Sequence, residues 1–325
     1  MSQKRILDFL GGKKILVLCG GSSSERLPSL QTGKKIFDSL VNEGFNVELI
    51  DLEENRLELI DKVKEAGLVF LGLHGGCGED GTIQGLLDFW GIPYTGSGIL
   101  GSSIGMNKLI TKKILTSEQL PTADFVAYGD AKDIVDFIDK AESKLGYPMM
   151  VKVWDEGSGN GVFFVNNNDE LNNTLKNIGD LSKVFIEKYI SGREIVVGIV
   201  EDCGETKVLP ILEILYKGDY FSPNVRKNSD TLRKDVEATL DGSVRKKIID
   251  VCSKSHRVLQ AKVYSRIDIK LEEVTNIPYV LEMTTLPGLT ENSWLPKMAQ
   301  MAGMSFSNLL NLIILSSIQK YDKQN

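Results

Sequence analysis

The chain has 325 residues, of which 42% are hydrophobic and 25% are charged, and its formal net charge is −6. This composition excludes a disordered, collagen-like or membrane-spanning chain, and the acidic balance argues against a nucleic-acid partner. The four cysteines are too widely spaced for a zinc site or a disulfide framework, so we expect a reducing, cytoplasmic compartment. We expect no targeting segment and no membrane partner, because the apolar runs near both ends are too short for either.

Strands and helices alternate over the first hundred residues, a pattern typical of a parallel sheet covered by helices on both faces. The predicted order is strand 13–19, helix 22–42, strand 46–52, helix 57–66 and strand 67–73. We therefore predict an α/β domain over 1–105. Eleven of the 31 glycines lie between Gly72 and Gly105, where we expect substrate-facing loops and the exit from this domain.

Two further domains are predicted, a central one over 106–190 and a C-terminal one over 191–325. The central domain is expected to contain helices at 107–117, 132–145 and 171–178 and strands at 148–153, 161–165 and 184–190. The C-terminal domain is expected to contain strands at 194–200 and 206–214, a helix at 244–261, two more strands and a last helix. A polar, weakly patterned segment lies between Tyr216 and Leu240, and loops of this length are commonly functional or mobile.

The two later strands, 265–271 and 278–284, alternate with period two around a short polar loop and predict a β-hairpin. In this register Asp268 lies opposite Glu282, and Arg266 lies opposite Thr284, on one face. The other face is predicted to carry the apolar side chains Ile267, Ile269, Leu271, Tyr279, Leu281 and Met283. Like charges opposite one another destabilise a strand pair unless a cation compensates them, and paired carboxylates suit Mg²⁺. The alternative is a solvated sheet face on which Arg266 neutralises one acid.

A glycine-rich turn follows Lys152 and joins two predicted strands. The sequence Gly157-Ser-Gly-Asn-Gly161 can fold backbone N–H groups over phosphates, although it is not a P-loop and an ordinary turn is the alternative. Two acids further on, Glu187 and Glu194, can accept hydrogen bonds from an adenine amino group and from ribose hydroxyls. The alternative for this pair is a charged strand end beside a solvated loop.

Several isolated residues have a structural and a functional interpretation. Glu25 ends a Ser22-x-x-Glu25 capping box, which would by itself explain it. His74 follows a predicted strand, where ligands bind to parallel sheets, whereas His256 is expected at the surface. Ser293 opens the last helix, where it would either cap the helix or receive a carboxylate.

The order of these motifs resembles the D-alanine–D-alanine ligases of the ATP-grasp superfamily, from about Lys13 to Ile318. The resemblance rests on Cys19-Gly-Gly-Ser-Ser-Ser-Glu-Arg, Leu73-His-Gly-Gly-Cys-Gly-Glu-Asp-Gly, Met106-Asn-Lys, Val151-Lys, Ile186-Glu-Lys, Arg266-Ile-Asp and Leu281-Glu-Met-Thr-Thr-Leu-Pro-Gly-Leu-Thr. It implies a three-domain α/β ATP-grasp fold whose N-terminal domain has a Rossmann-like parallel sheet. ATP and Mg²⁺ or Mn²⁺ would lie between the central and C-terminal domains.

The resemblance also implies the reaction. ATP phosphorylates the carboxylate of one D-alanine, and the amine of a second attacks the acyl phosphate to give D-alanyl-D-alanine for peptidoglycan and cell-wall synthesis. Carried over position by position, the residues implied to bind the nucleotide and metal are Lys108, Lys152, Glu187, Lys188, Glu194, Arg226, Asp268, Glu282 and Thr284. Ser158 is implied to be a catalytic residue in the flap over the phosphates and the first substrate. Those implied to hold the amino acids or stabilise the tetrahedral intermediate are Glu25, His74, Lys227, Arg266, the Gly288 N–H and Ser293.

Three departures from the family pattern are visible. Thr284 stands where the family has an asparagine metal ligand, the flap reads Gly-Ser-Gly-Asn-Gly, and only Pro223–Lys227 aligns with the mobile loop. Lys227 takes the place of the loop tyrosine, and an ion pair with Glu25 would be its substitute. These departures leave two alternatives open, a related ligase with other amino-acid substrates and a degenerate ATP-binding homologue. A homodimer is expected from the resemblance alone.

Overall fold

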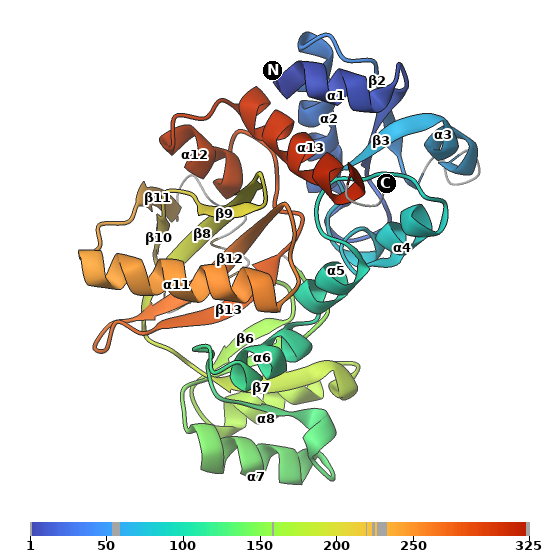
Figure 1. The fold of residues 1–325 in the computed structure, drawn as a ribbon. Coiled ribbons are helices and arrows are strands. Elements are labelled where there is room, and N and C mark those ends of the chain that lie inside the picture. The colour runs from blue at the N-terminus through green and yellow to red at the C-terminus, as the bar shows by residue number, and fades with distance from the viewer. Residues whose placement is uncertain are drawn as a thin grey trace.

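The structure, a computed structural model, describes residues 2–53, 59–157, 159–218, 220–222, 225 and 233–322. It contains three sheets in three units that follow one another along the chain (Figure 1). The four-stranded sheet lies at one end of the molecule, the parallel sheet lies at the other, and the largest sheet lies between them.

The first unit is built on the predicted parallel sheet, whose strand order is β2-β1-β3. Its elements are α1 (Ser2–Leu10), β1 (Lys14–Cys19), α2 (Arg26–Asn42), β2 (Val47–Asp51), α3 (Leu59–Glu65), β3 (Ala66–Leu71), the 3₁₀ helix η1 (Gly76–Gly78), α4 (Thr82–Phe89) and α5 (Ile99–Met106). Helices α1, α4 and α5 were not predicted.

The prediction that all the glycines from Gly72 to Gly105 form loops is wrong, because Gly85 lies in α4 and Gly101 and Gly105 lie in α5. At Gly101 a Cβ atom would stand 2.3 Å from the carbonyl oxygen of Gln260. Glycine is therefore needed at this position for close packing of a helix against backbone, rather than for a turn.

The second unit has an antiparallel sheet of order β4-β7-β5-β6. Its elements are α6 (Lys108–Ser117), β4 (Phe125–Ala127), η2 (Tyr128–Asp130), α7 (Ile134–Leu145), β5 (Met149–Val153), β6 (Val162–Val165), α8 (Asn168–Lys176), η3 (Leu181–Lys183) and β7 (Val184–Lys188). Asp133 caps α7 by accepting hydrogen bonds from the N–H groups of Val135 and Asp136. The apolar faces of the sheet and of α7 and α8 form a core of their own.

The third unit has an antiparallel sheet of order β11-β10-β8-β12-β13, with β9 also paired to β8. Its elements are β8 (Gly192–Asp202), β9 (Glu205–Val208), β10 (Leu212–Tyr216), β11 (Arg233–Glu237), α11 (Gly242–Val258), β12 (Tyr264–Glu272), β13 (Pro278–Thr284), α12 (Trp294–Met301) and α13 (Phe306–Asp322). The predicted strand 206–214 is two strands, separated at Leu209-Pro210, where proline has no N–H to donate to a ladder.

His256 is not at the surface, which corrects its predicted position. It is fully buried where α11 packs on the sheet, with Nδ1 2.7 Å from Ser265 Oγ and Nε2 3.3 Å from Glu201 Oε1. The helical pattern was interpreted correctly, but the face that it turns to the sheet was not.

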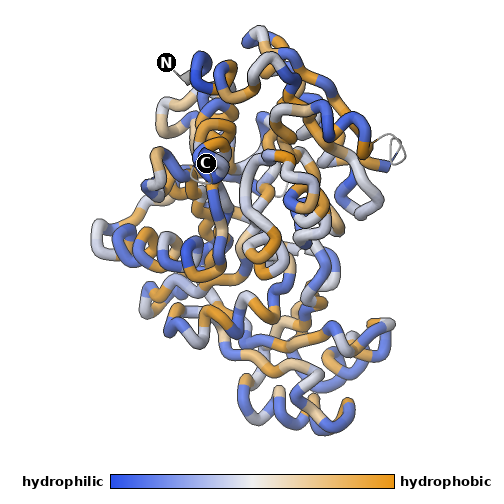
Figure 2. Tube along the Cα trace, turned by 45° about the vertical axis from the view of Figure 1, so that its right-hand side comes forward, coloured by the Kyte–Doolittle hydropathy of each residue, from blue (hydrophilic) through white to orange (hydrophobic). Residues whose placement is uncertain are grey.

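The first and third units share one hydrophobic core, whereas the second does not contribute to it. Helix α13 makes the connection, since it packs against α1, α2 and β8 (Figure 1). Figure 2 shows hydrophobic stretches along this last helix, close to the C-terminus. Among the described helices, no single one is long and apolar enough to cross a membrane; α12 and α13 would qualify only as a pair, and they are bent by 104°.

Candidate active site

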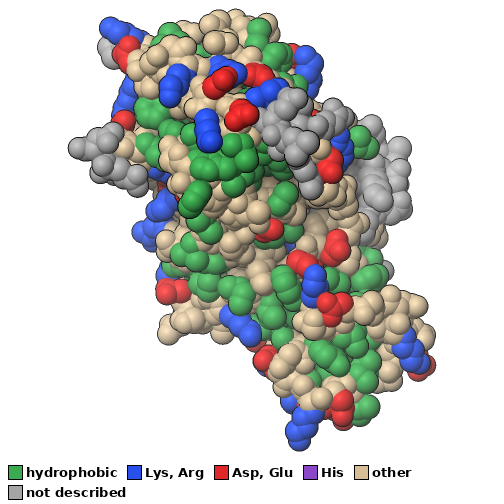
Figure 3. All heavy atoms as spheres, turned by 90° about the vertical axis from the view of Figure 1, so that its right-hand side faces the viewer, with side chains coloured by type: hydrophobic (Ala, Val, Ile, Leu, Met, Phe, Trp, Pro, Cys, Tyr) green, Lys and Arg blue, Asp and Glu red, His purple; other side chains and the backbone are tan. Residues whose placement is uncertain are grey.

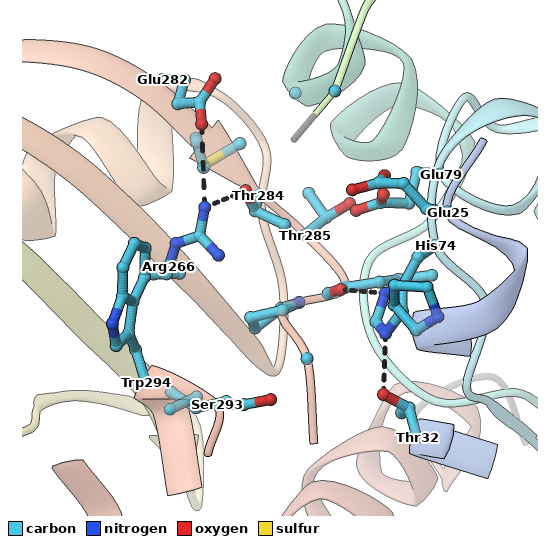
Figure 4. A pocket seen from close by; sticks show the side chains of 18 of the residues that line it. Glu25, Thr32, His74, Glu79, Arg266, Glu282, Thr284, Thr285, Ser293 and Trp294 are labelled. Carbon is cyan, nitrogen blue, oxygen red and sulfur yellow. Dashed lines mark hydrogen bonds and ion pairs between the residues drawn. The ribbon is translucent and has the colours of Figure 1, made fainter. Parts of the chain in front are cut away.

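Two cavities meet at the centre of the molecule. The His74 cavity lies between the first and third units, and Figure 4 shows Glu25, His74 and Glu79 facing Arg266 and Ser293 across it. The Lys152 cavity lies between the two antiparallel sheets and is named for the lysine that β5 contributes. Its lining also includes Glu187, Lys188, Glu194, Asp268 and Lys270.

A short wall belongs to both cavities. Lys108, Glu156, Glu282 and Trp294 line each of them. Lys108 Nζ donates a hydrogen bond of 2.6 Å to the backbone oxygen of Glu156 and lies 3.4 Å from Glu282 Oε2. A cation and a carboxylate are thus available to a group that reaches from one cavity into the other.

The hairpin register is confirmed, with Asp268 opposite Glu282 and Arg266 opposite Thr284. The predicted apolar face is wrong for part of β13, because a bulge after Asp268 pairs Ile269 with Val280. Val280 is therefore fully buried in the core, where Tyr279 and Leu281 had been expected. Leu281 lines the Lys152 cavity instead.

Arg266 organises the polar face of this hairpin. Its Nε and Nη2 atoms donate to the two carboxylate oxygens of Asp268 at 2.7 and 2.8 Å, and Nη2 also donates to Thr284 Oγ1 at 3.1 Å. Glu282 Oε1 lies 3.7 Å from the same Nη2. The alternative of a solvated face is wrong, because Asp268 is only 6% exposed, but Arg266 does bind one of the two acids.

Glu187 is held between two lysines in the Lys152 cavity. Its oxygens lie 2.5 Å from Lys152 Nζ and 2.8 Å from Lys112 Nζ. Burial alone would raise the pKa of Glu187, but the two ammonium groups outweigh it and hold that pKa below its ordinary value. For Lys152 burial works against the charged form, and Glu187 outweighs it, so its pKa is raised. The alternative of a charged strand end beside a solvated loop is excluded for Glu187.

Lys112 and Lys270 were not identified from the sequence as site residues. Lys112 is completely buried, and the signal for it was its position four residues after Lys108, on the same face of α6. Lys270 pairs with Glu194 across β12 and β8, with Nζ 2.9 Å from Glu194 Oε2 and 3.0 Å from the Tyr216 hydroxyl. Its signal was the position two residues after Asp268 on a strand.

His74 is uncharged in the His74 cavity. Burial lowers its pKa, and its Nδ1 lies 3.1 Å from the Leu286 carbonyl oxygen, which can only accept. Nδ1 therefore carries the proton, and Nε2 accepts the hydroxyl proton of Thr32 at 2.9 Å (Figure 4). Glu79, not found from sequence, accepts the Gly75 N–H at 2.6 Å, and burial together with nearby Glu25 raises its pKa to about 7.

The capping box that would have explained Glu25 does not form. Helix α2 begins at Arg26, and Glu25, the residue before it, makes no side-chain cap bond. Its carboxylate instead reaches two glycine loops, since a Cβ atom on Gly75 or Gly157 would stand 2.9 or 3.0 Å from Glu25 Oε2. Gly157 opens the predicted flap, so the start of the flap lies directly beside Glu25.

Ser293 does not cap α12 with its side chain. Its Oγ lies 2.8 Å from Thr290 Oγ1 and accepts the Thr290 N–H at 3.1 Å. A Cβ atom on Gly288 would stand 2.7 Å from Ser293 Oγ, so the Gly288 backbone lies next to the serine hydroxyl. Both residues line the His74 cavity.

Three predicted site residues, Ser158, Arg226 and Lys227, lie outside the described residues. Over the part of the chain that the structure describes, no three His, Cys, Asp or Glu side chains converge as a metal cluster. Asp268 and Glu282 nevertheless fit Mg²⁺, because this ion is commonly held by one or two carboxylates and completed by phosphates and water.

Comparisons with known proteins agree with this geometry. A family model described as the D-ala D-ala ligase C-terminus matches residues 114–315, and one for the D-ala D-ala ligase N-terminus matches residues 54–97. D-alanine–D-alanine ligase A of Bacillus cereus is 38% identical over 94% of this chain and 98% of its own. The ligase of Carboxydothermus hydrogenoformans is 34% identical over 95% of this chain and 100% of its own.

Solved structures extend the likeness to three dimensions. The crystal structure of D-alanine–D-alanine ligase from Bacillus anthracis matches with a TM-score of 0.83 and 36% identity over 97% of this chain and 100% of that one. The same enzyme complexed with ATP matches with a TM-score of 0.82 and 35% identity over 96% and 99%. The predicted α/β ATP-grasp fold is thereby confirmed, and the chain belongs to the D-alanine–D-alanine ligase family.

Proposed function

We propose that this chain is an ATP-dependent ligase that joins two molecules of D-alanine through an acyl-phosphate intermediate, for peptidoglycan synthesis. The observation that carries the proposal is the wall shared by the two cavities. Lys108 and Glu282 face both, so a phosphoryl group bound on one side has an acceptor within reach on the other. The names of the relatives supply the identity of the amino acid.

The Lys152 cavity would receive the nucleotide. Glu187 and Lys188, which line it, would border the adenine, Glu194 would border the ribose, and Lys108 and Lys152 would border the phosphates. Asp268 and Glu282, with Thr284 beside them, would hold Mg²⁺, which when bound neutralises phosphate charge and orients the transferred group. Thr284 already accepts a hydrogen bond from Arg266, which favours two carboxylates as the main protein ligands.

The His74 cavity would receive the two amino acids. Glu25 would hold the ammonium group of the first, beside uncharged His74, and Ser293 would receive the carboxylate of the second. Arg266 and the Gly288 N–H would stabilise the oxyanion of the tetrahedral intermediate, because fixed donors in a site shielded from water act most strongly on developing charge.

The reaction then has two balanced steps. A carboxylate oxygen of the first D-alanine bonds to the γ-phosphorus of ATP as the bond to ADP breaks. The amine nitrogen of the second D-alanine bonds to the acyl carbon and loses a proton, and phosphate departs with the carboxylate oxygen. The glycine flap beside Glu25 supports the exclusion of water from the acyl phosphate.

A phosphate-release screen across D- and L-amino acids, with ATP and Mg²⁺, tests this proposal. We expect release to depend on D-alanine. Release with a different amino acid would indicate a related ligase with other substrates, which the altered segment around Lys227 motivates. Nucleotide binding without release for any amino acid would indicate a degenerate homologue.

We further propose a homodimer. The helices α4 and α5 expose apolar side chains, with Phe89 85%, Leu100 60% and Ile99 46% accessible. Figure 3 shows hydrophobic side chains gathered on this side of the molecule. Light scattering on Phe89→Ser should report a shift from dimer to monomer, whereas a monomeric starting protein would contradict the proposal.

A further inference from the structure

The indole of Trp294, at the start of α12, lies against the guanidinium of Arg266. The Arg266 Cζ atom is 4.9 Å from the ring centroid, and Trp294 is only 8% exposed (Figure 4). Asp268 already binds one edge of this guanidinium through two hydrogen bonds. An aromatic ring attracts a guanidinium held over its face, so Asp268 fixes one edge of the Arg266 guanidinium and Trp294 contributes a second, attractive contact.

The orientation of the indole is itself fixed by Asp235. Trp294 Nε1–H donates to Asp235 Oδ2 at 3.0 Å, and Lys297 Nζ donates to the same oxygen at 2.9 Å. Arg233 Nε lies 2.9 Å from Asp235 Oδ1, and its guanidinium lies 5.3 Å from the Trp294 ring. The Asp235 side chain is only 6% exposed, yet it lines neither cavity.

A purely structural explanation exists for Asp235. Strand β11 is at the edge of its sheet, and inward-pointing charges on an edge strand discourage pairing with other chains. That explanation requires a charge on β11, but it does not require this charge to bind any particular side chain. It does not account for a carboxylate directed at the indole nitrogen of a ring that covers Arg266.

We propose that Asp235 and Trp294 are positioning residues for Arg266, which link β11 to the group that stabilises the tetrahedral intermediate. The expected effect on catalysis rests on the proposed function. The contacts that join Asp235, Trp294 and Arg266 do not depend on it. Strand β11 directly follows the segment that contains Arg226 and Lys227.

The decisive variant is Asp235→Asn, because Asp235 reaches neither ligand cavity. We expect kcat to fall about fivefold with the KM for ATP unchanged within about twofold, since only positioning in the transition state is lost. Trp294→Phe keeps the aromatic face and should lose a similar factor, whereas Trp294→Leu should lose about thirtyfold. Trp90→Phe changes an indole that lines neither cavity, and as the matched control it should leave kcat unchanged.

The double variant Asp235→Asn/Trp294→Phe tests whether the two residues act on Arg266 through one shared contact or independently of each other. If Asp235 acts through Trp294, the double variant is no slower than the slower single variant, within about twofold. Multiplied losses would overturn the proposal, as would wild-type kcat in Asp235→Asn. A lowered Tm with unchanged kcat would establish the structural explanation in its place.

A measurement independent of turnover keeps the link testable if the proposed function fails. The chain has three tryptophans, so its ¹⁵N–¹H spectrum contains three indole N–H signals, and Trp294→Phe identifies one of them. We expect Asp235→Asn and Arg266→Lys each to shift this signal and to leave the other two in place. An unmoved Trp294 signal in both variants overturns the link, whereas wild-type protein without ligase turnover overturns only the function.

Discussion

The two cavities balance their charges in different ways. In the Lys152 cavity each buried acid is paired with a cation, with Glu187 bound by Lys152 and Lys112, Glu194 by Lys270 and Asp268 by Arg266. In the His74 cavity Glu25 and Glu79 lie together beside an uncharged His74 (Figure 4). Internal ion pairs thus organise the first cavity, whereas the two acids of the second lie where we propose that the ammonium group of the first amino acid binds.

The shared wall offers the strongest test of this comparison, because Glu282 serves both cavities. We expect Glu282→Gln to lower kcat by about a thousandfold or more, since it removes a metal-binding carboxylate at the point of phosphoryl transfer. Steady-state phosphate release measures the loss, and circular dichroism confirms folding. The exposed Glu291→Gln is the matched control, and turnover of folded Glu282→Gln within threefold of wild type would rule out this role.

Breaking the ion pairs of the Lys152 cavity should affect both stability and nucleotide binding. Lys152→Met leaves the buried Glu187 with Lys112 alone, and removal of one partner from a buried ion pair costs about 3 to 5 kcal/mol of unfolding free energy. We also expect the KM for ATP to rise about tenfold or more. Urea unfolding and ATP titration measure the two effects. Lys183→Met removes a half-exposed lysine of the same unit, and equal effects in the two variants would contradict the comparison.

The acidic side of the His74 cavity predicts a dependence of stability on pH. The pKa of Glu79 rises from 4.5 to about 7 on folding, so between these values the native state holds a proton that the unfolded chain has lost. The unfolding free energy should therefore fall as pH rises from about 4.5 to about 7, by about 2 to 3 kcal/mol. Glu79→Gln should lack this fall in urea titrations at several pH values. The same slope in both proteins would assign it to other groups.

The smallest expected effect concerns the hydrogen bond that Thr32 donates to His74. Thr32→Val keeps the shape of the side chain but leaves His74 Nε2 without its donor, at a cost of about 1 to 2 kcal/mol. We expect the KM for the first amino acid to rise a few-fold while the KM for ATP stays constant. Equal changes in both would show that the two cavities are not independent.

Sequence patterns predicted the parts of this site that depend on short-range periodicity. Period-two alternation was sufficient to set Asp268 opposite Glu282, because a shift of one residue would have turned both acids into the core. The bulge that moves Val280 into the core has no signal in that alternation. The boundaries at 105 and 190 between the predicted domains stay predictions.

Other features depend on contacts between distant segments, which no local pattern contains. The capping box at Ser22 competes with a turn in which Ser23 Oγ accepts the Glu25 N–H and donates to the His74 carbonyl oxygen, 51 residues away. Nothing in the sequence around Lys112 distinguishes it from other helical lysines, because its partner Glu187 lies on a distant strand. His256 is similarly buried only because α11 packs against the sheet.

The central claim is that the carboxylate of one amino acid in the His74 cavity receives phosphate from the nucleotide in the Lys152 cavity. Turnover with D-alanine labelled with ¹⁸O in its carboxylate tests it directly, by mass spectrometry of the released phosphate. We predict one ¹⁸O atom in each phosphate and one D-alanyl-D-alanine for each ADP. Unlabelled phosphate would mean that water, and not the carboxylate, attacks the nucleotide, and it would contradict the proposed function.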